Sequence, residues 1–204
     1  MTIETPVLIV GGGPIGLTLA LDLAWRGIDV TVAETRSEAE PPPPKCNHVA
    51  ARSMEIFRRL GVAESLRNAG LPADYANDVS YRTAFASKEL TRIPIPCRED
   101  RYTATEGPDA NWPTPEPPHR INQTFLEPIL FAHAKASPRI TLLNETAIME
   151  ISQDDDGALA TARHVGSGAE QQIRCQCIIG CDGGGSMVRK RIGAKFEGDA
   201  VIQR

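Results

Sequence analysis

The stretch Val7-Leu8-Ile9-Val10-Gly11-Gly12-Gly13-Pro14-Ile15-Gly16 decides the fold, because an apolar strand pattern passes here into a glycine-rich turn. Gly11 allows a tight turn out of the strand, Gly13 leaves room for a pyrophosphate to approach the backbone, and Gly16 lets a helix lie close to the sheet. We expect that helix to end at Gly27. Its N-terminus offers free N–H groups and the positive end of its dipole to phosphate oxygens.

A second strand and an acidic residue follow this helix at the expected distance. Residues 28–33 alternate as a strand does, and Glu34 at its end can accept hydrogen bonds from a ribose diol. Thr35 and Arg36 follow directly and belong to the same predicted site. Strand, glycine turn, helix, strand and acid together predict adenine-dinucleotide binding rather than a purely structural turn.

The composition is that of an ordinary globular domain. The chain has 204 residues, of which 41% are hydrophobic and 24% charged, and its net charge of −4 gives no reason to expect a nucleic acid or an anionic membrane as partner. We expect no secretory signal at the N-terminus and therefore a cytoplasmic location. Five cysteines without framework spacing fit a reducing compartment, and no metal site is expected.

The middle of the chain predicts short elements and long loops. We expect helices over 51–61 and 63–68, and strands over 79–85 and 89–93. The proline-rich segment 98–119 predicts a long connection of the functional or mobile kind.

The pattern becomes regular again after this loop. Thr124-Phe125-Leu126-Glu127 has a capping-box pattern that opens a helix, with Pro128 in or just after its first turn. Strands are expected over 139–143, 147–151, 159–165 and 172–179, with a hairpin turn at 154–157 and an antiparallel meander from about Arg139 to Val165. The last strand predicts an apolar face of Ile173, Cys175, Cys177 and Ile179.

A second glycine motif follows that strand, Gly180-Cys181-Asp182-Gly183-Gly184-Gly185-Ser186-Met187-Val188-Arg189. Ser186 is expected to cap a short helix that Gly193 ends. Asp182 can accept from hydroxyl groups or hold a cation such as Arg189.

The two glycine motifs together resemble the flavoprotein aromatic hydroxylases, the single-component FAD monooxygenases that include p-hydroxybenzoate hydroxylase and the bacterial phenol and chlorophenol hydroxylases. Arg52-Ser53-Met54-Glu55 resembles the family's helix whose arginine faces the flavin. Arg120-Ile121-Asn122-Gln123 resembles the segment whose glutamine contacts it, and Phe196-Glu197-Gly198 is similar to the phenol hydroxylase branch.

The resemblance implies a cofactor and a reaction. FAD is reduced by NADPH or NADH, reduced flavin adds dioxygen to form a C4a-hydroperoxide, and one oxygen atom passes to a phenolic or other aromatic substrate. The chemistry belongs to the cofactor, so no catalytic side chain is expected. By position, the implied cofactor-binding residues are Gly11, Gly13, Pro14, Ile15, Gly16, Glu34, Thr35, Arg36, Arg52, Gln123 and Asp182.

The sequence departs from the family at its end. The family's later Gly-Asp-Ala-Ala-His motif does not occur in these 204 residues, so we expect an N-terminal portion of a longer hydroxylase. Two alternatives stay open: a truncated FAD- or ADP-binding module without activity of its own, and a flavin oxidase or dehydrogenase on the same core. The choice between NADPH and NADH, the particular substrate and homo-oligomer formation are also left open.

The predicted fold class is α/β, a glutathione-reductase-like FAD-binding Rossmann core with an antiparallel meander and a partial inserted substrate sheet. The predicted domains are a FAD-binding βαβ unit with its following helices (1–78), the first substrate-domain strands with the proline-rich loop (79–119), and the return to the FAD-binding domain (120–204).

Overall fold

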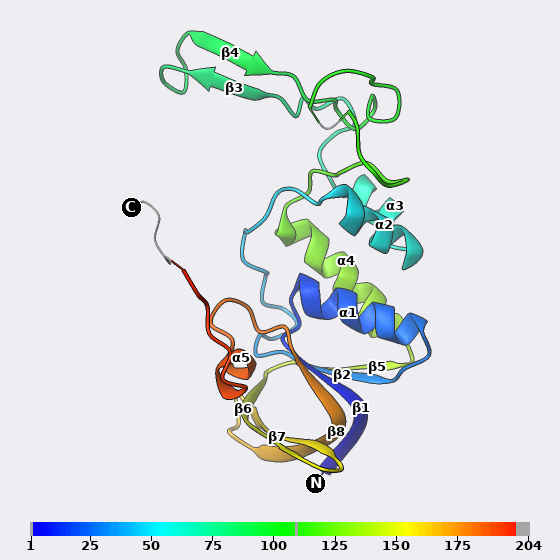
Figure 1. The fold of residues 1–204 in the computed structure, drawn as a ribbon, viewed down its shortest axis with the longest axis vertical. Coiled ribbons are helices and arrows are strands. Elements are labelled where there is room, and N and C mark those ends of the chain that lie inside the picture. The colour runs from blue at the N-terminus through cyan, green and yellow to red at the C-terminus, as the bar shows by residue number, and fades with distance from the viewer. Residues whose placement is uncertain (1, 109, 199–204) are drawn as a thin grey trace. The chain divides into compact units, whose positions relative to one another are not determined.

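The computed structural model describes residues 2–108 and 110–198, which form two compact units (Figure 1). The first unit joins residues 1–40 to residues 131–204, and the second comprises residues 41–130. The boundaries of these units differ from those of the predicted segments 1–78, 79–119 and 120–204. The functions assigned to the three segments stay predictions. None of the helices within the described ranges is long and apolar enough to cross a membrane.

The first unit is built on a mixed six-stranded sheet in the order β5-β2-β1-β8-β7-β6. Its strands are β1 (Thr2–Val10), β2 (Val30–Ala33), β5 (Ile140–Leu143), β6 (Thr146–Asp154), β7 (Gly157–His164) and β8 (Glu170–Gly180). β5, β2, β1 and β8 are parallel, whereas β6, β7 and β8 pair antiparallel. The α/β prediction is therefore confirmed at the level of a mixed sheet with helices.

Burial along β1 explains its place in the centre of the sheet. Val7, Leu8, Ile9 and Val10 are all buried, as expected for a parallel strand covered on both faces. The helix α1 (Pro14–Trp25) packs along β1, β2 and β5 (Figure 1). On β8, Ile173 and Cys175 enter the core around Leu8, and the short helix α5 (Met187–Arg191) adds Val188 to the same cluster.

Two expectations for this sheet are wrong. The meander does not begin at Arg139, because β5 pairs parallel with β2 at one edge and the antiparallel run is β6-β7-β8. Cys177 is exposed, so the apolar face predicted for the last strand is interrupted. The hairpin turn is confirmed, since Asp154 pairs with Gly157 across it.

The second unit contains short elements joined by loops. These are α2 (Ala51–Arg59), α3 (Ala63–Asn68) and the two-stranded sheet of β3 (Val79–Arg82) and β4 (Glu89–Ile93). Arg67 of α3 donates hydrogen bonds to the Glu116 carboxylate, at 2.7 Å, and to the carbonyl of Pro117. A β-bridge joins Val49 to His119, so the proline-rich loop is tied to the start of α2. The strand predicted over 79–85 is shorter than expected.

The helix α4 (Gln123–Ala136) begins one residue before Thr124. Its cap is Asn122, whose Oδ1 accepts from the backbone N–H of Thr124 at 2.9 Å. The capping box predicted at Thr124 and Glu127 is therefore wrong: the Glu127 carboxylate accepts from the side chain of Gln123 instead. As a result, Pro128 lies inside the helix and beyond its first turn.

Candidate cofactor site

The candidate site lies where three parallel strands end. Because β2, β1 and β8 run in the same direction, the residues that follow them meet at one edge of the sheet. Backbone hydrogen bonds fix this edge: Gly11 donates to the carbonyl of Ala33 at 2.8 Å, and Cys181 donates to the carbonyl of Val10 at 2.7 Å. The first glycine motif, the acid after β2 and the second glycine motif are thus brought together in the first unit.

The glycines of the first motif meet different surroundings. Gly11 has φ +105°, and a Cβ there would lie 2.4 Å from the carbonyl oxygen of Cys181. At Gly16 a Cβ would lie 1.9 Å from the carbonyl oxygen of Gly11, so only glycine lets α1 pack this closely on the turn. Around Gly13, in contrast, nothing described lies within 4 Å of an added Cβ. This open position is the one at which a ligand can reach the backbone.

The N-terminus of α1 faces this opening without a side-chain cap among the described residues. Gly13 is its N-cap residue, and Pro14 occupies the first turn, where a missing N–H costs least. Ile15 is 72% exposed. The first backbone N–H groups of the helix are therefore available to an anion, and the helix dipole favours negative charge at this end.

Glu34 is held in place by the turn beside it. Its Oε2 accepts from the backbone N–H of Gly12 at 2.6 Å, and its Oε1 accepts from the backbone N–H and the Nε of Arg36 at 2.9 and 3.1 Å. Thr35 adds a longer hydroxyl contact of 3.3 Å to Oε1. Burial of the Glu34 carboxylate opposes its ionisation, but the hydrogen bonds from Arg36 and Gly12 outweigh burial and lower its pKa. Glu34 is an oriented carboxylate acceptor at neutral pH.

Asp182 caps α5 and does not bind Arg189. Its Oδ2 accepts from the backbone N–H groups of Met187, at 2.6 Å, and Val188, at 3.2 Å, and its Oδ1 accepts from the Ser186 hydroxyl. Burial opposes ionisation of Asp182, but these hydrogen bonds lower its pKa. The idea that Asp182 could hold Arg189 is wrong, because that guanidinium donates to the carbonyl of Gly184 and lies over the Phe196 ring.

The caps predicted for α5 are confirmed. Ser186 is its N-cap residue and accepts from the backbone N–H of Arg189 at 2.9 Å. Gly193 follows the helix with φ +75°.

Comparison with known proteins identifies the family. A family model described as the FAD binding domain matches residues 4–204. The chain belongs to the FAD binding domain family.

Two curated relatives and a solved structure show how far this match extends. The domain is 32% identical over 197 residues to an FAD-dependent monooxygenase, apdD, of Emericella nidulans, covering 96% of the chain and 31% of that protein. It is 32% identical over 196 residues to a phenol 2-monooxygenase of Pseudomonas sp., covering 95% of the chain and 31% of that protein. The rebeccamycin biosynthetic enzyme RebC, solved with reduced flavin, gives a TM-score of 0.82 at 34% identity, covering 95% of the chain and 35% of RebC.

The chain therefore spans about a third of the length of the relatives that it matches. The predicted resemblance to FAD-dependent aromatic hydroxylases is confirmed for the part of those proteins that the chain matches.

Two residues predicted to contact the flavin lie in the second unit of this FAD binding domain. Arg52 is on α2 and forms an exposed ion pair with Glu55 at 2.9 Å. Gln123 begins α4, and its backbone N–H donates to the carbonyls of Lys45 and Cys46. These hydrogen bonds hold the loop before α2 to the start of α4. The roles of Arg52 and Gln123 toward a flavin stay predictions.

Sequence reasoning missed Gly12 in the FAD binding domain. A Cβ at Gly12 would lie 2.9 Å from the Cβ of Glu34, so this middle glycine makes room for the acidic side chain. The signal was available in the sequence as the middle one of three consecutive glycines, 22 residues before the acid. Among the described residues no group of three or more His, Cys, Asp or Glu side chains could hold a metal ion. Burial raises the pKa of the Cys175 and Cys181 thiols, which are therefore protonated at neutral pH.

Proposed function

We propose that this chain supplies the FAD-binding part of a FAD- and NAD(P)H-dependent monooxygenase that hydroxylates a phenolic or other aromatic substrate. The observation that carries the proposal is the open backbone at Gly13, between the uncapped start of α1 and the oriented Glu34 carboxylate. The family match over residues 4–204 and a relative named phenol 2-monooxygenase support it.

The residues present fit the adenosine diphosphate part of FAD. A pyrophosphate at Gly13 would accept from backbone N–H groups at the start of α1, and no described atom lies within 4 Å of the position that a Cβ would take there. The Glu34 carboxylate would accept from the hydroxyl groups of the adenosine ribose. Arg36, which donates to Glu34, would keep that carboxylate in place.

The remaining predicted roles belong to the same proposal. Arg52 and Gln123 would face the flavin, and Asp182 would stabilise the second glycine motif as well as contribute to cofactor binding. When bound, FAD supplies the redox chemistry, accepting electrons from a nicotinamide and reacting with dioxygen. A glutathione-reductase-like course of the chain, the preference for NADPH or NADH and a cytoplasmic location are predictions of the same kind.

The experiment that tests the proposal is a FAD titration of the purified chain, followed by flavin fluorescence and absorption. We expect saturable binding, with Glu34→Gln weakening it. ADP should compete with FAD, because the residues that carry the proposal contact only the adenosine diphosphate part. Failure of both FAD and ADP to bind would refute the proposed site.

The proposed reaction needs its own test. Oxygen consumption with NADPH or NADH and a panel of phenols, measured on the protein containing this chain, is expected to depend on the phenol and to yield a hydroxylated product. Hydrogen peroxide without hydroxylated product would favour a flavin oxidase on the same core.

A further inference from the structure

The short connection between β5 and β6 lies against the segment that carries the candidate ribose acceptor. It consists of Asn144 and Glu145 and leads into Thr146 at the start of β6. The Asn144 side-chain amide and the backbone N–H of Glu145 both donate to the carbonyl of Arg36, at 3.2 and 3.1 Å. The backbone N–H of Thr146 donates to the carbonyl of Glu34 at 2.8 Å. Three consecutive residues therefore hold the backbone of the acceptor segment at two points.

The connection is itself fixed in an uncommon conformation. Glu145 has φ +51°, in the left-handed region that residues other than glycine rarely adopt. Its carbonyl accepts from the backbone N–H of Val165 at 2.7 Å. Thr146 is buried, and its hydroxyl donates to the carbonyl of Asn144 at 3.0 Å. An unfavourable backbone conformation that aims donors at a neighbouring segment points to a positioning role.

The restraint reaches the Glu34 carboxylate through Arg36. Oε1 of Glu34 accepts from the backbone N–H and the Nε of Arg36, at 2.9 and 3.1 Å. Both donors belong to the residue whose carbonyl is held by Asn144 and Glu145. Oε2 is held separately, by the backbone N–H of Gly12 at 2.6 Å. A displacement of Arg36 would therefore turn the carboxylate about its hydrogen bond to Gly12, because Oε1 would lose its donors.

Asn144 makes the contribution that depends on a side chain. The N–H groups of Glu145 and Thr146 belong to the backbone, and any residue except proline supplies such a donor. The third donor is the half-buried amide of Asn144. An uncharged amide adds a donor without adding a charge that would compete for the carboxylate. A substitution of Asn144 therefore removes one defined hydrogen bond from the acceptor segment.

We propose that Asn144 is a positioning residue for the cofactor, which holds the Arg36 carbonyl and thereby keeps the Glu34 carboxylate oriented toward the adenosine ribose. This rests on the proposed function, because the ribose contact is assigned there. It adds that selectivity for a ribose diol depends on the connection between β5 and β6. The contribution of the diphosphate, assigned to the open backbone at Gly13, is independent of Asn144.

The test compares two nucleotides in isothermal titrations of the purified 204-residue chain. ADP carries the ribose diol, and 2′,3′-dideoxy-ADP carries the same base and diphosphate without it. We expect the wild-type chain to bind ADP about tenfold more tightly, since the dideoxy compound cannot donate to the carboxylate. Asn144→Ala is expected to weaken ADP binding about fivefold and to leave dideoxy-ADP affinity within about twofold. A merely structural role of Asn144 would weaken both nucleotides alike.

Two further variants test the path of the effect. Asn144→Asp keeps the shape of the side chain but has no N–H to donate, so it should reduce the discrimination as Asn144→Ala does. Both nucleotides carry the same diphosphate, so the ratio of their affinities cancels the effect of the added charge. Adding Asn144→Ala to Glu34→Ala should weaken ADP binding no further, because Asn144 acts through the Glu34 carboxylate.

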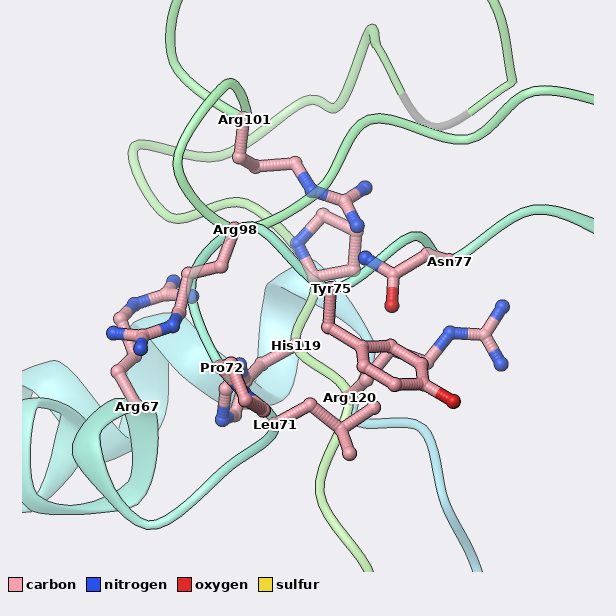
Figure 2. A pocket seen from close by; sticks show the side chains of 10 residues that line it. Arg67, Leu71, Pro72, Tyr75, Asn77, Arg98, Arg101, His119 and Arg120 are labelled. Atoms are coloured by element: carbon pink, nitrogen blue, oxygen red, sulfur yellow. The ribbon is translucent and has the colours of Figure 1, made fainter.

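Asn77→Ala is the matched control. The Asn77 side-chain amide also donates to a backbone carbonyl, that of Pro96, at 3.1 Å. Asn77 belongs to the second unit and lines a small pocket there (Figure 2). Four arginine side chains line the same pocket: Arg67, Arg98, Arg101 and Arg120. This arginine-lined pocket has a volume of about 10 Å³, far too small for a nucleotide, so Asn77→Ala should leave both affinities within about twofold.

Several results would overturn the proposal. Wild-type discrimination between the two nucleotides in Asn144→Ala, or an equal loss of affinity for both, would remove the role of Asn144 and leave the proposed function intact. Equal binding of both nucleotides by the wild-type chain would remove the ribose contact together with the role of Asn144. If the wild-type chain binds neither nucleotide, the proposed function fails and this proposal fails with it.

Discussion

The substitution Gly13→Ala should separate cofactor binding from stability. Gly13 has φ −75° and ψ −174°, a conformation that alanine adopts without strain. An added Cβ meets no described atom within 4 Å. The methyl group would therefore project into the space that we assign to the pyrophosphate. Within the described chain no steric clash opposes the substitution.

The expected magnitudes follow from these two facts. Replacing glycine by alanine at a compatible position restricts the unfolded chain, so the free energy of unfolding should rise by about 0.4–1 kcal/mol. For a chain of this size that is an increase in melting temperature of about 1–4 °C. Losing one backbone hydrogen bond to a charged phosphate oxygen costs about 1.5–3 kcal/mol, so FAD affinity should fall by about ten- to hundredfold. Thermal unfolding without ligand and a FAD fluorescence titration measure the two effects.

Gly27→Ala is the matched control. A Cβ at Gly27 also meets nothing within 4 Å, but its φ is +85°, so alanine there is strained by about 1–2 kcal/mol. We expect Gly27→Ala to lower the melting temperature and to leave FAD affinity unchanged, the opposite of Gly13→Ala. Wild-type FAD affinity in Gly13→Ala would refute the placement of the pyrophosphate at this turn. A lower melting temperature in Gly13→Ala would contradict the conclusion that the space around Gly13 can accept a methyl group.

Three further predictions follow from the same contacts. Gly16→Ala should lower the free energy of unfolding by about 3 kcal/mol, seen in urea titration, because its Cβ would lie 1.9 Å from the carbonyl oxygen of Gly11. Glu34→Gln should weaken FAD binding about tenfold in the fluorescence titration, since the amide accepts more weakly than the carboxylate; unchanged affinity would contradict the ribose contact. The contribution of His119 to the free energy of unfolding should fall by up to about 3 kcal/mol from pH 6.5 to pH 4 and then level off, because the unfolded chain protonates His119 in that range while burial lowers its folded pKa to about 4. His119→Asn should remove this part of the pH dependence of the urea midpoint.

The glycine turn was predictable because its causes are contiguous in the sequence. Gly16 is needed for a close contact with Gly11 within the turn itself, and Gly27 and Gly193 end helices by their own backbone conformation. Local rules of this kind operate over a few residues, so one sequence is enough to apply them.

The strand order was not predictable by the same means. The pattern of β5 is that of a strand, but nothing in it distinguishes a partner in β2 from a partner in β6. The short link to β6 favoured a hairpin, and the structure instead pairs β5 with a strand more than 100 residues earlier. The same limit explains α4: the capping pattern at Thr124 was a valid local signal, and Asn122, two residues earlier, took the role instead.

The arginine-lined pocket shows why a site built from loops is harder to find than one built from a motif. Arg67, Arg98 and Arg120 are separated by more than 20 residues each, and in the sequence each is an ordinary surface cation. They line one pocket because the bridge between Val49 and His119 and the hydrogen bonds from Arg67 fix the loop after residue 98. A buried Nε atom without a hydrogen-bond partner, such as that of Arg98 or Arg120, can be recognised only when every described neighbour is placed, so no sequence pattern could have predicted it.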